Sequence, residues 1–201
     1  MNFKPNEILL FIIAFTVWIY LLTVLRRNKL TAFHFMLGST GLFTFVFLML
    51  KKPLTYFCSI ILMNVLALLS HVFSFYEVYK DYFILFINNK DANISMLIDY
   101  ECCGVIEILV VLSIVIFFPL FDVKKKIIYS FIGFVYVVAA NVLRLLIICF
   151  VIYVHGNNSY YIAHSLVGRI IFYILTVVLY FYMISRNQIG HQKVGNFEYG
   201  D

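Results

Sequence analysis

The chain has 201 residues, of which 64% are hydrophobic and 19% aromatic, while only 12% are charged. Since about a quarter of the residues of a typical soluble domain are charged, this composition excludes an ordinary soluble protein and indicates an integral membrane protein. The formal net charge of +5 does not predict nucleic-acid binding, because the basic residues lie in short flanks between apolar runs, where they act as topology signals.

Hydropathy predicts an all-α fold, a polytopic transmembrane helical bundle of about six spans, as one domain over residues 1–184. The first apolar run, 8–25, is too long for a removable signal peptide and is expected to remain as a span. We expect 77–101 to be a long connection and 185–201 to be a polar cytoplasmic tail. Each expected span has about the 20 residues that cross ~30 Å of hydrocarbon: 7–25, 32–50, 54–76, 102–121, 127–153 and 162–184.

The positions of Lys and Arg predict how these spans are oriented in a plasma membrane. With the N-terminus inside, the cytoplasmic side carries Lys51, Lys52 and the three lysines of 124–126. The loop 155–161 has no Lys or Arg and is expected outside. The basic loop 26–29 falls on the outer side in this arrangement, so the first half follows the rule poorly.

Three reactive side chains lie in or beside apolar segments of the second half: Cys102, Arg144 and His164. Thiol, guanidinium and imidazole groups in such segments usually have a function. Counting ~20 residues, at ~1.5 Å each, from the inner end of each span places all three near the outer edge of the bilayer. Because short connections make the last three spans neighbours, we expect these groups to lie close together.

Each of these groups also has a structural interpretation. A lone cysteine in a lipid-embedded helix is most often a small buried apolar residue, and an interfacial histidine often only bonds a loop carbonyl. In the functional interpretation, Cys102 begins a helix whose positive end favours a thiolate, and His164 is a general base. Gly168, four residues after His164 on the same helix face, would allow a neighbouring helix to approach closely.

Arg144 is expected to point into the bundle, since a guanidinium facing lipid is costly. Asn141, three residues earlier on the same face, is expected to orient it. Arg144 either stabilises an oxyanion or forms an internal ion pair with Glu107. Arg169 is the rival partner, and matching depth favours a structural pair of Glu107 with Arg169, which leaves Arg144 for chemistry.

At these residues the chain resembles the exosortase/archaeosortase family of membrane cysteine transpeptidases, and most closely the short exosortase G branch of Gram-positive bacteria. The motifs that carry the resemblance lie within 99–184 and occur in the family's order: Cys102-Cys103-Gly104, Asn141-Val142-Leu143-Arg144 and His164-Ser165-Leu166-Val167-Gly168. Cys103 stands where the family has Ser or Ala, and the chain is shorter than the commonly eight-span members.

The resemblance implies Cys102 as nucleophile, Arg144 as oxyanion stabiliser and His164 as proton carrier, with no metal or cofactor. Its implied partners are a client protein with a C-terminal sorting signal, an envelope acceptor and the lipid bilayer, and the implied site faces outward. Two other functions remain open. One is a non-enzymatic membrane scaffold, transport or assembly subunit with structural buried ion pairs, and the other is a membrane protease that hydrolyses its clients.

Overall fold

The computed structural model describes residues 5–88, 93–100, 102–156 and 159–185. The chain is mostly helical, and four of its helical segments are long and apolar enough to cross a membrane. They are α1 (Pro5–Arg27), α2 (Thr31–Leu69), α4 (Val123–His155) and the continuous segment Tyr160–Ser185, which comprises α5 (Tyr160–Ile162), η3 (Ala163–Val167), α6 (Gly168–Tyr180) and η4 (Phe181–Ser185). A shorter apolar helix, α3 (Val105–Phe117), precedes α4. A helical membrane protein is thus confirmed, while six spans are not.

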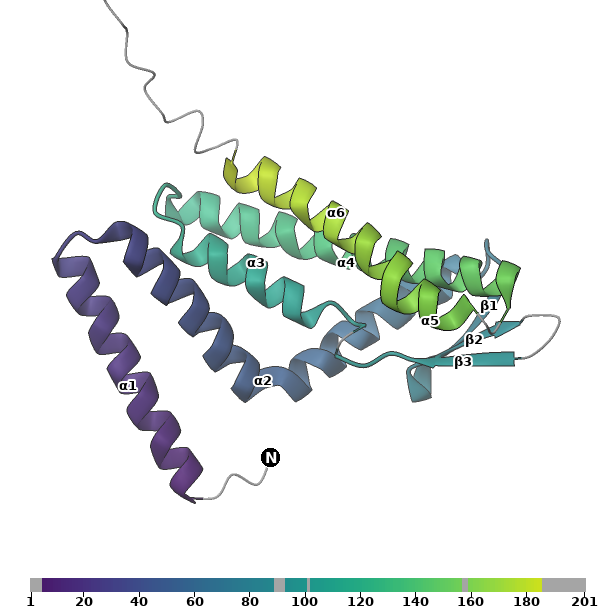
Figure 1. Ribbon diagram of the computed structural model, residues 1–201, viewed down its shortest axis with the longest axis horizontal. Helices are drawn as coiled ribbons and strands as arrows, with labels where there is room; N and C mark the ends of the chain where they lie inside the picture. Colours follow the sequence, from purple (N-terminus) through teal and green to yellow (C-terminus); the bar gives the residue numbers. More distant parts are fainter. Residues whose placement is uncertain (1–4, 89–92, 101, 157–158, 186–201) are drawn as a thin grey trace, which may run out of the picture.

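Helix α2 contains both the second and the third predicted spans. Its 39 residues would extend ~58 Å if straight, about twice the thickness of the hydrocarbon core. The chain bends instead near Pro53, as Figure 1 shows. Proline lacks the N–H of a helical hydrogen bond and its ring crowds the preceding turn, so it bends this helix without ending it. The separator that the sequence suggested is therefore a kink.

The segment expected to be a loop contains a small antiparallel sheet, so the all-α prediction is wrong here. Its strands β1 (Tyr76–Tyr79), β2 (Ile84–Asn88) and β3 (Asn93–Leu97) lie in the order β1-β2-β3. Leu85 and Ile87 of β2 and Met96 of β3 are buried, whereas Ser95 is exposed. This alternation gives the sheet one face for the core, as expected for a half-buried antiparallel sheet.

The half of α2 after the kink packs against this sheet. The Tyr76 hydroxyl donates to the Leu66 carbonyl at 2.7 Å, and Lys80 Nζ donates to Asn64 Oδ1 at 3.0 Å. The Tyr56 ring meets the Phe83 ring edge-on at a centroid distance of 5.8 Å. The predicted span 54–76 is therefore half of a bent helix, followed by a turn and the start of β1.

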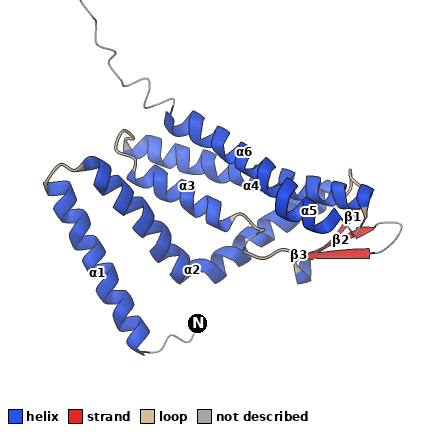
Figure 2. Cartoon of the chain, in the orientation of Figure 1, coloured by secondary structure: helices blue, strands red, loops and turns tan. Residues whose placement is uncertain are grey.

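Helices α3, α4 and α6 lie side by side, with the sheet at one end of the group (Figures 1 and 2). Helix α3 packs on both α2 and α4, and α4 packs on α6. The starts of α3 and of the Tyr160–Ser185 segment both lie near the sheet, because α4 runs the length of the bundle between them. This topology brings the first and last motifs to one end of the molecule.

The basic residues do not divide between the two ends as predicted. Arg26 and Lys29 line the same cavity as Lys126, so the α1–α2 turn and the α3–α4 turn lie at one end. Lys51 was expected on the same side as the lysines of the α3–α4 turn. Its Nζ instead lies 3.2 Å from the ring centroid of Tyr100, at the sheet end. The sequence left the placement of the first two spans open, and the structure puts the turn between α1 and α2 at the same end as the turn between α3 and α4. The predicted tail, except Ser185, lies outside the described residues.

Candidate active site

Cys102 and Cys103 lie in a tight turn between β3 and α3. The carbonyl of Asp99 accepts the backbone N–H groups of both cysteines, each at 2.9 Å. Gly104 then adopts φ +78°, a left-handed conformation that glycine adopts readily, and α3 begins at the following residue. The prediction that Cys102 begins a helix is therefore wrong, since it precedes α3. The tight turn between β3 and α3 positions its thiol.

The Cys102 thiol contacts the His164 imidazole. Cys102 Sγ lies 3.1 Å from His164 Nε2, and the cysteine is 5% exposed. The two residues are 62 positions apart in the sequence and come from different elements. The shared proton can lie on either atom, depending on the protonation state of the ring. A thiol and an imidazole at this distance form the pairing that activates nucleophilic cysteines.

His164 lies in an irregular part of its helix. Residues Ala163–Val167 form η3, a π-helical turn, between the α-helical turns of α5 and α6. Such turns are rare and occur frequently at functional sites. The ring of Tyr160 stacks on the His164 imidazole with a centroid distance of 5.9 Å and an interplanar angle of 7°. Neither feature was recognised from the sequence, in which no spacing signals a π-helical turn.

Gly168 brings this irregular turn close to α4. A Cβ at this position would lie 2.6 Å from Ile148 Cδ1 and 3.0 Å from Ile148 Cγ1, closer than real side chains pack. Because Ile148 is fully buried, it has little room to move aside. The glycine therefore permits the helix contact that holds the His164 turn beside α4.

Asn141 of α4 holds the backbone of the cysteine turn. Its Nδ2 donates to the Cys102 carbonyl at 2.7 Å, and the side chain is fully buried. The sequence predicted a different role, the orientation of Arg144. The Asn141 amide instead links α4 to the residue that carries the candidate nucleophile, and it packs closely against Gly104.

Arg144 is 4% exposed, so its side chain lies inside the bundle, as expected. Its Cζ lies 5.6 Å from the ring centroid of Phe172, and its charge acts on the Glu107 carboxylate. Its Nε is buried with no hydrogen-bond partner.

The predicted pair of Glu107 with Arg169 is wrong. Arg169 is exposed, whereas Glu107 is partly buried and interacts with the charge of Arg144. In the described part of the chain, no ion pair joins Glu107 to Arg169. Depth alone could not separate the two arginines, because they lie at similar levels on different helix faces. The structure thus leaves Arg144 as the guanidinium inside the bundle.

Cys103 has a different environment from its neighbour. Its Sγ donates to the Tyr100 carbonyl at 3.7 Å, and burial raises the pKa of this thiol to about 11. A thiol with this pKa stays protonated at neutral pH and is a poor nucleophile. The two adjacent cysteines are therefore chemically distinct, and only Cys102 is seen against an imidazole.

Comparisons with known proteins do not assign the chain: no family model, no curated protein and no solved structure matches it. Within the described residues, no group of three His, Cys, Asp or Glu side chains could hold a metal ion. The chemistry of the site is therefore argued from the arrangement of Cys102, His164, Asn141 and Arg144. A buried thiol paired with an imidazole can perform nucleophilic acyl transfer.

Proposed function

We propose that the chain is a membrane-embedded cysteine transpeptidase of the exosortase type. It would cleave the C-terminal sorting signal of a client protein and transfer the client to an envelope acceptor. The observation that carries this proposal is the 3.1 Å contact between Cys102 Sγ and His164 Nε2. The order of the Cys, Arg and His motifs, with their Gly and Asn neighbours, supports the same assignment.

In the proposed reaction, His164 Nε2 takes the thiol proton, and the Cys102 thiolate attacks a backbone carbonyl carbon of the client. A C–S bond forms, and the carbonyl oxygen becomes an oxyanion. When this intermediate collapses, the C–N bond breaks and His164 returns the proton to the leaving amine. The product is a thioester between the client and Cys102. An acceptor amine then attacks the thioester and releases the thiol.

Arg144 is assigned to the oxyanion, and Asn141 is a positioning residue. The assignment of Arg144 rests on its burial within the bundle and on its Nε–H, which has no hydrogen-bond partner. An unsatisfied buried donor is suited to an acceptor that develops only during the reaction. Asn141 acts through the Cys102 carbonyl, which it holds at 2.7 Å.

We also propose that the site faces the extracytoplasmic side of the plasma membrane. Basic residues collect at the cytoplasmic ends of membrane proteins. The end of the bundle opposite the site carries six of them in or beside its two turns: Arg26, Arg27, Lys29, Lys124, Lys125 and Lys126. This distribution supports a cytoplasmic position for both turns and an outward position for Cys102.

The proposal is tested by isolating the acyl-enzyme from cells that express the chain and its native clients. We expect a peptide joined to Cys102 through a thioester, identified by mass spectrometry and released by neutral hydroxylamine. The adduct should be absent in Cys102→Ala and retained in the matched variant Cys103→Ala. No adduct on either cysteine would exclude the mechanism and favour a non-enzymatic scaffold. Equal adducts on both cysteines would contradict the assignment of Cys102 as the nucleophile.

A further inference from the structure

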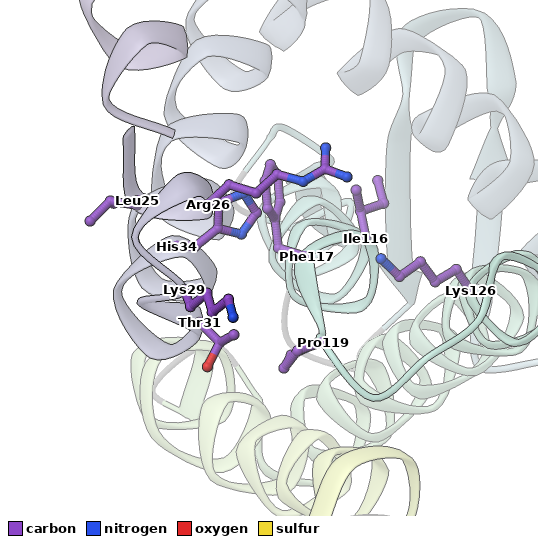
Figure 3. A pocket seen from close by; sticks show the side chains of 9 residues that line it. All are labelled: Leu25, Arg26, Lys29, Thr31, His34, Ile116, Phe117, Pro119 and Lys126. Atoms are coloured by element: carbon purple, nitrogen blue, oxygen red, sulfur yellow. The ribbon is translucent and has the colours of Figure 1, made fainter. Parts of the chain in front are cut away.

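A basic cavity lies at the end of the bundle opposite the candidate active site. It has a volume of about 560 Å³ and is formed where the α1–α2 turn approaches the α3–α4 turn. Figure 3 shows that Arg26 and Lys126 extend toward this space from opposite sides. Its volume lies within the range of cavities that bind small molecules, about 300–1,000 Å³.

The lining of this cavity is strongly basic. Arg26, Lys29 and Lys126 contribute three cations, His34 contributes an imidazole, and no acidic residue lines the cavity. In the described part of the chain, none of the three cations forms an ion pair. Two helices end and two begin around this cavity, so their dipoles largely cancel and the positive charge comes from the side chains. Such a set of donors suits a phosphate group.

The same cavity also has an apolar wall, which indicates the source of the phosphate. Leu25, Ile116 and Phe117 line it beside the cations, and the Phe117 ring packs against His34 with a centroid distance of 5.7 Å. The cavity lies where apolar helices end, at the expected level of the lipid headgroups. Free phosphate would use only the cations, whereas a phospholipid would use both parts of the lining.

We propose that this cavity binds the phosphate headgroup of an anionic phospholipid, with the start of its acyl chains against the apolar wall. Basic pockets between transmembrane helices on the cytoplasmic side are suited to such headgroups. The lipid would join Arg26, at the end of α1, to Lys126, at the start of α4. This link matters for α1, since no residue within its apolar core is buried by the rest of the protein. The proposal does not depend on the proposed function.

The experiment measures lipid binding to the full chain in a neutral detergent by native mass spectrometry. The probes are phosphatidylglycerol, zwitterionic phosphatidylcholine with the same acyl chains, and inorganic phosphate as competitor. The test variant is Arg26→Gln with Lys126→Gln. Its matched control is Lys124→Gln with Lys125→Gln, which removes the same net charge from neighbouring exposed positions that do not line the cavity.

We expect saturable binding of phosphatidylglycerol that exceeds binding of phosphatidylcholine. Each interfacial charge contributes about fivefold to the affinity for an anionic lipid, so loss of two charges in the test variant should weaken binding by about 25-fold. The control should change it by less than about twofold. An equal loss of phosphatidylglycerol binding in both double variants would show that only the general surface charge matters, and it would overturn the proposal. Displacement of the lipid by millimolar phosphate would overturn the lipid assignment in favour of a free anion. Thermal unfolding in detergent verifies that each variant is folded.

Discussion

The contact of Gly168 with Ile148 predicts that two substitutions will compensate each other. Gly168→Ala places a methyl group where Ile148 Cδ1 lies 2.6 Å away. Overpacking of this kind costs about 1–3 kcal/mol, and the better helix propensity of alanine offsets ~1 kcal/mol. We therefore expect Gly168→Ala to lower the free energy of unfolding by about 0–2 kcal/mol.

Ile148→Val removes the Cδ1 methyl that the new alanine would meet. Alone, it should cost about 0.5–1.5 kcal/mol, as is usual when a buried methyl group is lost. Independent effects would then add to about 0.5–3.5 kcal/mol. In the double variant the added methyl replaces the removed one, so the cost should fall close to zero. The cycle should therefore give a coupling energy of about 0.5–3.5 kcal/mol.

The assay is thermal unfolding in detergent, together with the rate at which an alkylating reagent modifies Cys102. His164 lies one helical turn from Gly168, so a shift of this helix away from α4 should separate the imidazole from the thiol. Gly168→Ala should therefore slow alkylation, and addition of Ile148→Val should restore it. Additive losses of stability in the double variant would refute this account of the contact. So would a double variant that recovers full stability but whose Cys102 is still alkylated slowly.

Two further predictions concern the cysteine turn. Asn141→Ala leaves the buried Cys102 carbonyl without its donor at 2.7 Å. This should lower the free energy of unfolding by about 1–3 kcal/mol and slow Cys102 alkylation. Unchanged unfolding and unchanged alkylation would contradict the role of Asn141. For Cys103, burial raises the pKa to about 11, so the folded state keeps a proton that the unfolded state loses above pH ~9. Stability should therefore fall as pH rises from about 9 to 11, and Cys103→Ala should reduce this fall, as measured by unfolding at each pH. An identical pH dependence in the variant would contradict the raised pKa of Cys103.

The sequence predicted that Cys102 and His164 would lie close together and that Arg144 would point into the bundle, and the structure shows both. Depth counting follows Cα positions, and a thiol or an imidazole stays near its own Cα. An arginine side chain is long enough to reach about one turn along its helix, so the level of its Cα does not fix that of its guanidinium. The same limitation explains why Arg169, which faces away from the bundle, was matched to Glu107 by depth alone.

The fold differed from prediction where short signals competed with hydropathy. Lys51 and Lys52 resembled a loop between spans, yet charged residues are compatible with a continuous helix and Pro53 only bends it. The sheet had only a partial signal, because polar and apolar residues alternate at the start of β3 (Asn93–Leu97), whereas Ile84–Ile87 of β2 form an uninterrupted apolar run. Strands of four or five residues are too short for a hydropathy window to separate from a polar connection.

The kink and the sheet together determine how the site is built. Without the bend in α2, its second half could not reach the sheet, and the turn after β3 would lack support from Lys51 on Tyr100. The motif spacing alone contains none of this information. It identifies the reactive side chains, while the tertiary packing determines which of them meet.

The central claim, that His164 activates Cys102, is tested most directly by the pH dependence of Cys102 alkylation, followed by peptide mass spectrometry in a Cys103→Ala background. An unassisted thiol is only about 3% ionised at pH 7 and is almost fully ionised at pH 10. The account predicts that His164→Gln slows alkylation about tenfold or more at pH 7 and that the two rates converge near pH 10. Equal rates at pH 7 would contradict the claim.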